Sequence, residues 1–423
     1  MRRRTFMVTA FGAAGSVLVS TTSCGNGGSG GSANQVEVFS WWTGGGEEVA
    51  LEALKNDFEK RNEDITFENA AVAGGSGTNA QSVLQSRLQA NSPPDSFQGH
   101  AGAELLDYIQ AGQLEPLDSF YEKNKLAEAF SEQLVEQITH EGHVYSVPLN
   151  VHRSNVLWYS PKVLDQAGIS EPATSIEQFI DQLDMVKSDT DKIALSLGAQ
   201  WTANHLLESV LLGSLGADGY NQLWTARGDW GAADVTGALE SFGQILEYAN
   251  QEAENSDWQV AARNVVDGKA AFNIMGDWAH GYFLDPLKKK ENEDFGWAAS
   301  PGTDGVHLWL ADSFTLPEGA PHRDAALKWL RQVASKRGQD IFNPKKGSIP
   351  ARVDADRSLY KGYLSWALEE WANSDLAGSY WHGVVASNKW KTAIDTAVGV
   401  FLQDADVAKL QGSLVDAAEQ HAA

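Results

Sequence analysis

The chain has 423 residues, 43% of them hydrophobic, with 56 acidic and 32 basic side chains and a formal net charge of −24. So acidic a surface repels phosphate backbones and anionic head groups, which argues against nucleic-acid binding and against charge-driven attachment to membranes. The length exceeds one ordinary core, so we expect two packed lobes. The acid excess is also typical of high-salt habitats, the alternative being an ordinary acidic secreted protein.

The first 23 residues predict an export signal. Arginines at positions 2–4 precede an uncharged, moderately apolar stretch over 7–19, which is too short to span a bilayer permanently. The arginine pair ahead of Phe6 resembles a twin-arginine signal, which a translocase for folded proteins reads. We therefore expect an extracytoplasmic protein.

The only cysteine, Cys24, stands directly between the apolar stretch and a Gly/Ser-rich run over 25–32. This position resembles a lipobox, in which Cys24 becomes the lipidated N-terminus and residues 24–35 tether the protein to the cell membrane. The alternative is a chance free thiol. A single cysteine excludes a disulfide within the chain, a thiolate zinc site made of several cysteines and a cysteine nucleophile in the mature fold.

After the tether, strand and helix patterns alternate, which predicts an α/β fold with a largely parallel sheet. On the second expected helix, Val83, Leu84 and Leu88 are predicted to face inward. Ligands of such sheets bind at the carboxyl ends of the strands, so the following loops should carry the chemistry. The expected strand and helix pairs are 36–40 with 47–60, 65–72 with 80–90, and 95–98 with 101–111.

The second half begins with a long extended run over 145–159, of the kind that passes between domains. Strands are expected at 270–274 and 306–316, and the chain from Leu359 onward should be mainly helical. The other expected helices are 175–187, 203–215, 235–253, 258–267 and 323–335.

Five motifs, each weak alone, are highly specific together. They are VFSWWTGG at 38–45, FQGHAG at 97–102, VPLNVHRSN at 147–155, GKAAFNIMGDW at 268–278 and FNPKKGSI at 342–349. On these motifs the chain, from Val36 to about Leu402, resembles the extracellular solute-binding proteins of ABC sugar importers, sugar-binding family 1. It is most similar there to the glucose- and galactose-type monosaccharide binders.

The resemblance implies a two-lobe periplasmic-binding-protein fold of type II. The ligand cleft would lie between lobes that are joined by crossing strands and close by a hinge movement. Crossings would fall near 147–151, 305–308 and 347–352. The N-lobe would comprise 36–148 and 309–347, and the C-lobe 149–308 and 348–423. Its partners would be a small sugar, an ABC permease and the nucleotide-binding subunits of that importer, and the protein would be a monomer.

A hexose presents an apolar face of C–H bonds and a rim of hydroxyls, so its site needs aromatic plates and charged hydrogen-bond partners. By resemblance, Trp42 and Trp258 would sandwich the sugar ring, with Trp41 beside Trp42. For each of these tryptophans, the alternative is ordinary core packing.

The candidate acceptors are Glu47 and Asp312, because a carboxylate can accept from two adjacent hydroxyls. Glu47 has the alternative of stabilising its helix dipole, in which case Glu48 could bind instead. Asp312 lies in a hydrophobic strand, where an unpaired charge would be costly.

The remaining ligand candidates can donate to or accept from hydroxyls: Gln98, His100, Lys346 and His382. Three residues of the first crossing, Asn150, His152 and Arg153, either touch the ligand or hold the hinge.

The sequence thus predicts a receptor that delivers a monosaccharide, a glucose-type hexose above all, to an importer, and not an enzyme. One alternative is a glycoside hydrolase using Glu47 and Asp312, but nothing in the sequence sets the separation such a pair needs. Another is a receptor for an oligosaccharide, a polyol or a polyamine. No phosphate loop, zinc-ligand spacing or nucleophile elbow appears, so we expect no metal or cofactor.

Overall fold

The structure is a computed structural model that describes residues 34–73, 77–251, 253 and 256–422. The predicted leader, Cys24 and the tether up to residue 33 lie outside the described residues. Among the helices described, none combines the length and the apolar character that crossing a membrane requires.

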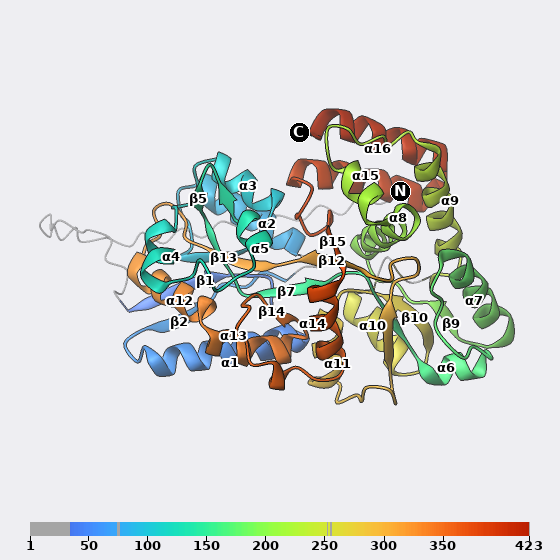
Figure 1. The fold of residues 1–423 in the computed structure, drawn as a ribbon, viewed down its shortest axis with the longest axis horizontal. Coiled ribbons are helices and arrows are strands. Elements are labelled where there is room, and N and C mark those ends of the chain that lie inside the picture. The colour runs from blue at the N-terminus through green and yellow to red at the C-terminus, as the bar shows by residue number, and fades with distance from the viewer. Residues whose placement is uncertain (1–33, 74–76, 252, 254–255, 423) are drawn as a thin grey trace, which may run out of the picture. The chain divides into compact units, whose positions relative to one another are not determined.

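The first lobe is built on a five-stranded sheet with the strand order β2-β1-β3-β13-β6. Strand β1 (Gln35–Phe39) lies parallel to β2 (Thr66–Asn69) and β3 (Ser96–His100). Strand β13 (Asp312–Thr315) returns from far along the sequence and runs antiparallel to β3 and to β6 (Ser146–Pro148). The helices of this lobe are α1 (Gly45–Arg61), α2 (Thr78–Gln89), α3 (Ala103–Gln110), α4 (Asp118–Asn124), α5 (Glu132–Glu136), α12 (Arg323–Ala334) and α13 (Lys336–Lys346) (Figure 1). A two-stranded ribbon, β4 (Thr139–His140) with β5 (His143–Val144), completes it.

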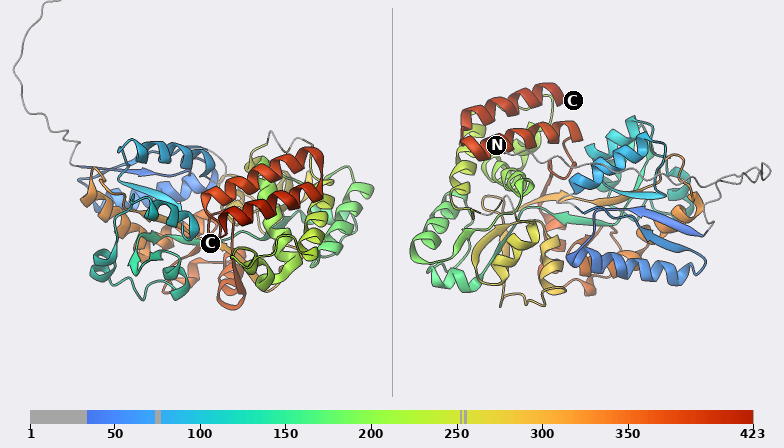
Figure 2. Two further views of the ribbon diagram at one scale, coloured as in Figure 1. Left: turned by 90° about the horizontal axis from the view of Figure 1, so that it is seen from above. Right: turned by 180° about the vertical axis from the view of Figure 1, so that it is seen from behind.

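The second lobe is built on a four-stranded sheet with the order β11-β8-β10-β9. Strand β8 (Val156–Tyr159) is antiparallel to β10 (Ala270–Ile274) and to β11 (Gly296–Ala299), whereas β9 (Ile193–Leu195) is parallel to β10. Its helices are α6 (Pro161–Gln166), α7 (Ile176–Asp189), α8 (Gln200–Leu223), α9 (Ala233–Leu246), α10 (Trp258–Val266), α11 (Trp278–Leu284), α15 (Asn388–Asp404) and α16 (Val407–His421). The last two pack on α8 and α9, as Figure 2 shows in red and green.

A third sheet of four short strands, β14-β7-β12-β15, connects the two lobes. The chain passes from β6 through β7 (Asn150–Arg153) to β8, and later from β12 (Val306–Leu310) directly into β13. Strand β14 (Ile349–Pro350) pairs with β7, and β15 (Asp375–Gly378) lies parallel to β12. Helix α14 (Tyr363–Asn373) and a 3-10 turn (Arg357–Leu359) lie between them in sequence. The predicted two-lobe α/β fold with crossing strands is confirmed (Figure 1).

Several details of the predicted elements were wrong. The sheets are mixed rather than largely parallel, because strands β6, β7, β8, β11, β13 and β14 form antiparallel pairs. The strand expected over 306–316 divides into β12 and β13, which belong to different sheets. Val83 is 41% exposed, because neighbouring residues point about 100° apart on a helix and only Leu84 and Leu88 fall on the buried stripe of α2. The extended run over 145–159 divides into three strands of three different sheets. The helix expected over 235–253 ends at Leu246.

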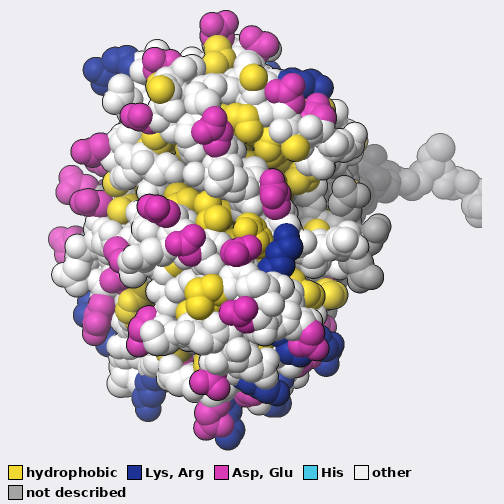
Figure 3. Space-filling model, turned by 90° about the vertical axis from the view of Figure 1, so that its right-hand side faces the viewer, with side chains coloured by type: hydrophobic (Ala, Val, Ile, Leu, Met, Phe, Trp, Pro, Cys, Tyr) yellow, Lys and Arg dark blue, Asp and Glu magenta, His cyan; other side chains and the backbone are white. Residues whose placement is uncertain are grey.

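Acidic side chains are spread over the face in Figure 3, and the basic side chains visible there form no continuous patch. Such a surface agrees with the net charge of −24.

Candidate functional site

One pocket gathers side chains from both lobes and from the connecting sheet. It has a volume of about 90 Å³. The lining residues lie at or after the ends of strands β1, β2, β3, β10, β12 and β15, within β7, and at the start of β13. Others begin helices α1, α8, α10 and α11 or end α13. The carboxyl ends of strands are where ligand groups are expected in an α/β sheet. Its lining residues are Trp41, Trp42, Thr43, Glu47, Ala73, His100, His152, Trp201, Asp257, Trp258, Gln259, Trp278, Leu310, Asp312, Lys346 and His382.

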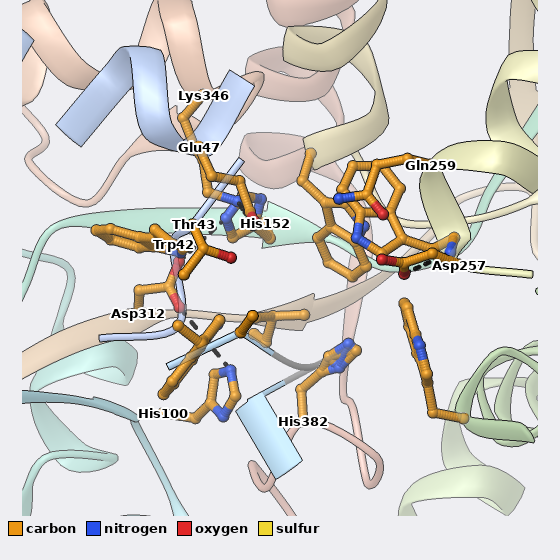
Figure 4. A pocket seen from close by; sticks show the side chains of 16 residues that line it. Trp42, Thr43, Glu47, His100, His152, Asp257, Gln259, Asp312, Lys346 and His382 are labelled. Atoms are coloured by element: carbon orange, nitrogen blue, oxygen red, sulfur yellow. Dashed lines mark hydrogen bonds and ion pairs between the residues drawn. The ribbon is translucent and has the colours of Figure 1, made fainter. Parts of the chain in front are cut away.

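Every predicted ligand residue except Gln98 lines this pocket. Figure 4 shows Trp42, Glu47 and Lys346 on one side, with Asp257 and Gln259 opposite them. The structure therefore brings together side chains that lie some three hundred positions apart in the sequence.

Gln98 lies behind the pocket wall, where it holds two of the lining residues. Its Nε2 donates to Oδ1 of Asp312 at 2.8 Å, and its Oε1 accepts from the backbone N–H of Trp41 at 3.4 Å. Gln98 is 1% exposed, so these contacts satisfy a side chain that would be costly to bury unpaired.

Asp312, the first residue of β13, is a buried carboxylate with several donors. Asn150 Nδ2 lies 2.8 Å and His152 Nε2 3.2 Å from its Oδ2, and Gln98 donates to the other oxygen. Burial raises the pKa of Asp312, but the hydrogen bond and charge of His152, with the charges of Lys346 and His100, outweigh burial and hold this pKa well below its usual range. Asp312 is therefore ionised and works as an acceptor.

His152 joins Asp312 to a second buried carboxylate, Asp277. The ring nitrogen Nδ1 of His152 contacts Asp277 Oδ1, and the other oxygen of Asp277 accepts from the backbone N–H of Arg153 at 3.0 Å. Burial lowers the pKa of His152, but the charge of Asp277 and the hydrogen bonds to both carboxylates raise it above the usual value. A protonated His152 balances the two acids, a role that sequence reasoning left open.

Glu47 and Lys346 form a buried ion pair at the pocket wall. Lys346 Nζ donates to Glu47 Oε1 at 2.9 Å, and Lys346 is only 2% exposed. Glu47 also lies in the first turn of α1, so its dipole role and its position at the pocket coexist. The pair leaves Glu47 Oε2 without a protein donor among the contacts of the described chain.

His100 reaches the pocket from the end of β3 and is oriented by the carboxylate behind it. Its Nδ1 lies 2.9 Å from Glu104 Oε2, which also accepts from Gln81 Nε2 at 2.8 Å. Burial raises the pKa of Glu104, yet the charge and hydrogen bond of His100 lower it overall, so the carboxylate fixes Nδ1–H of His100 as the donor. The Nε2 atom of His100 then points toward Asp312, 3.8 Å away, and the ring lies against Trp41.

The tryptophans come from both lobes. Trp42 packs its ring on Phe342, at 4.9 Å between centroids, and on Phe314. Trp258 approaches Tyr282 edge-on in the second lobe. Trp42 therefore packs in the core and also lines the pocket, while its contact with a sugar stays a prediction.

Two further lining tryptophans were missed by sequence reasoning. Trp278 stacks on His382 at 5.1 Å and 24°, and Trp201 lies beside it. Trp278 follows the carboxyl end of β10, a signal that could have identified it, whereas no local pattern distinguishes Trp201. The first turn of α10 also adds Asp257 and Gln259.

His382 is a neutral imidazole at the floor of the pocket. Burial, with the charges of His100 and Lys391, lowers its pKa well below the usual value. Its Nδ1 is buried and has no hydrogen-bond partner among the described residues. Because Nδ1 is buried, only the rest of this imidazole ring can meet a ligand in the pocket.

The two lobes touch on both sides of the pocket. A Cβ atom at Gly46 of α1 would lie 2.6 Å from the backbone of Gly281 in α11, so the absence of a side chain allows the helices to meet. On the other side, the N–H groups of Ala103 and Glu104 donate to carbonyl oxygens of Val384 and Gly383 at 3.0 and 2.8 Å. The lobes are in a closed arrangement around the pocket.

Residues 43–340 match the family of bacterial extracellular solute-binding proteins. An uncharacterised ABC transporter extracellular-binding protein of Pyrococcus horikoshii is 34% identical over 389 residues, 90% of this chain and 87% of that protein. A probable sugar-binding periplasmic protein of Rhizobium meliloti is 34% identical over 373 residues, 86% of this chain and 88% of the relative. The solved structure of a bacterial solute receptor with an exclusive substrate preference for β-D-galactopyranose has a TM-score of 0.80 and 18% identity, covering 92% of this chain and 98% of that receptor.

Proposed function

Since the chain belongs to the family of bacterial extracellular solute-binding proteins and is a sugar receptor of an ABC importer, we propose that it captures a single pyranose of the glucose type. It then delivers this sugar to the membrane permease, while the nucleotide-binding subunits of the importer hydrolyse ATP.

The size of the pocket carries the proposal of a monosaccharide. A volume of about 90 Å³ corresponds to about six to nine water-sized bodies, far less than an oligosaccharide requires. The lobes also touch at two places beside this space, which limits the room for a longer chain.

The chemistry of the walls fits one sugar ring with its hydroxyls. Trp42 from the first lobe and Trp258 from the second supply apolar faces, while Glu47, Asp312 and Lys346 supply charged acceptors and a donor. His100 and His382 serve hydroxyls at the floor. We assign Gln98 an indirect role, through its hydrogen bond to Asp312.

We infer that the site binds sugar without hydrolysing it. A glycosidase needs one carboxyl that keeps a proton, yet the pKa of Asp312 is held well below its usual range. Glu47 is already paired with Lys346.

We keep the lobe boundaries 36–148 with 309–347 and 149–308 with 348–423 as a proposal, in which the cut at 308/309 falls within β12 of the connecting sheet. Strands β1, β2, β3, β6 and β13 fall in the first set, and β8 to β11 in the second. Hinge bending would act on the short connecting sheet, with the receptor working as a monomer.

Export and anchoring rest on the N-terminal sequence. We propose that the leader is removed, that Cys24 carries lipid and that the Gly/Ser run holds the receptor outside the cytoplasm at the cell membrane. Replacing Cys24 by Ser is expected to move the protein from the membrane fraction into the medium or the extracytoplasmic space, and an unchanged membrane fraction would contradict the anchor.

Isothermal titration tests the ligand. We expect one site per chain and tight binding of one or two members of a panel of glucose, galactose, mannose and xylose. We expect no heat from di- and trisaccharides of the same units. Tight binding of an oligosaccharide with none of a monosaccharide would contradict the proposal and favour the alternative receptor.

A further inference from the structure

Glu208 is a fully buried acid in the middle of α8, outside the pocket lining, with 0% exposure. Its only ion-pair contact among the described residues is His205, with 3.6 Å between Oε1 and Nδ1. Burial lowers the pKa of His205 to about 4, so this ring is neutral and supplies no charge. Burial raises the pKa of Glu208 to about 7, although its hydrogen bonds with Ser154 and Ser379 lower this pKa in part.

The hydrogen bonds around His205 fix where the protons are. Nε2 of His205 faces the carbonyl oxygen of Ser154 at 2.9 Å, so Nε2 carries the hydrogen and Nδ1 is a bare acceptor. The hydroxyl of Ser154 lies 3.3 Å from Nδ1 and supplies the missing donor. Ser154 Oγ is also 2.6 Å from Glu208 Oε1, and when its hydrogen points to His205, Glu208 must be the donor of this short contact.

The second oxygen of Glu208 holds the segment that leads to His382. Oε2 accepts from the hydroxyl of Ser379 at 2.7 Å and from the N–H of Trp381 at 3.3 Å. Oγ of Ser379 in turn accepts from the N–H of His382 at 3.1 Å. One carboxyl group therefore connects the crossing segment between β7 and β8 with the turn after β15.

We propose that Glu208, as an un-ionised carboxylic acid, is a positioning residue that fixes the imidazole of His382 in the pocket by linking Ser154 to the turn of residues 379–382. This inference rests on the proposed sugar site. Loss of the proton forces the Ser154 hydroxyl to turn to the carboxylate, which leaves Nδ1 of His205 without a donor and buries a charge without a cation.

The groups that face Glu208 add no compensating charge. His205 comes from its own helix and Tyr220 from the later part of α8, while Tyr380 and His382 come from the segment after β15. Both histidines have lowered pKa values and both tyrosines have raised ones, so all four are neutral near pH 7. Ionisation of Glu208 is therefore opposed by burial alone, and sugar affinity should fall as the pH rises through about 7.

The test compares sugar affinity by isothermal titration at about pH 6 and about pH 8.5 in the wild type, Glu208→Gln and Glu240→Gln. A glutamine amide donates to Ser154 and accepts from Ser379, as the un-ionised acid does, but cannot lose a proton. We expect the dissociation constant of the wild type to rise roughly tenfold between the two pH values, and that of Glu208→Gln to stay level. Glu240, an exposed acid on α9, is the matched control, and its variant should follow the wild type.

Matching profiles of wild type and Glu208→Gln would overturn the inference while leaving the sugar receptor intact. Absence of sugar binding by the wild type at every pH would instead reject the proposed function, and the positioning role with it. One ring nitrogen each of His205 and His382 and one carboxylate oxygen of Glu208 lie within 4.8 Å of one another, so one equivalent of a divalent metal in the purified protein would also overturn the inference. The melting temperature of the wild type should fall relative to that of Glu208→Gln over the same pH range, which tests the proton without the sugar.

Discussion

At the scale of single residues, some side chains that line the pocket are also packed in the core. Trp42 is 1% exposed and packs on Phe314 and Phe342, yet it also lines the pocket. His152 lies between two acids and keeps them from repelling each other. Each of these side chains therefore has a structural role and also lines the pocket.

Replacing Trp42 by Ala should affect both properties. We expect sugar affinity to fall by about a hundredfold or more, because an aromatic plate is lost, and the free energy of unfolding to drop by about 3–5 kcal/mol, because a cavity forms beside two phenylalanines. Titration and chemical denaturation measure the two effects. Trp297→Ala, in β11 and away from the pocket, is the control with unchanged affinity, and normal binding by Trp42→Ala would remove this residue from the site.

At the scale of elements, the meeting of α1 and α11 depends on one glycine. A Cβ at Gly46 would lie 2.6 Å from the Gly281 backbone, whereas a Cβ at Gly44 would meet nothing within 4 Å. Gly44 has an extended backbone with φ −168°, which any residue can adopt. These two glycines therefore provide a matched pair.

Gly46→Ala should hinder closure and leave the separate lobes folded. We expect sugar affinity to fall roughly tenfold or more, because the lobes can close only if the backbones of α1 and α11 move apart. Gly44→Ala should bind the sugar as the wild type does. Titration measures affinity, and small-angle scattering with saturating sugar measures closure. Equal affinities of the two variants would show that α1 and α11 need not touch for binding.

Elements with a clear hydrophobic period were predicted well from the sequence. The strand Ala270–Ile274 was placed correctly, and α12 within a residue at each end. Helix α13 was missed because it is polar and contains Pro344, so it depends on its packing against α1, α11, α12 and β14. The division of the long extended run was also not predictable, because it depends on which distant strands each part meets.

Pocket residues that stand in a recognisable sequence motif were predicted. Those that only the folding of the chain brings to the pocket were missed. The pair Trp41 and Trp42 and the acid Asp312 stand in recognisable segments. Trp201 begins a helix with no distinctive neighbours and reaches the pocket only because α8 is oriented toward it. Gln98 shows the converse, since a residue in a recognised motif lies behind the wall.

At the scale of the whole molecule, the resemblance to sugar receptors of ABC importers is confirmed by the family match and by relatives at 34% identity. The high-salt habitat stays a prediction. Its physical basis is the net charge of −24, because the excess carboxylates repel one another when the salt concentration is low.

The melting temperature should therefore rise steeply with potassium chloride, up to molar concentrations, where the screening length is about 3 Å. Differential scanning calorimetry measures this rise. The same melting temperatures measured in an uncharged osmolyte serve as the control, because an osmolyte is excluded from the protein surface but does not screen its charges. A melting temperature that is level between dilute and molar salt would identify an ordinary acidic exported protein.

The two contacts between the lobes beside the pocket also bear on how a ligand would leave. With Gly46 against Gly281 on one side and residues 103–104 bonded to 383–384 on the other, the lobes must lose these contacts before they can separate. We therefore expect the time for which a sugar stays bound to depend on the rate at which the lobes separate, rather than on the lifetime of any individual bond to the sugar. Release of the sugar is then controlled by lobe separation. A membrane partner that separated α1 from α11 would release the sugar without competing for its binding groups.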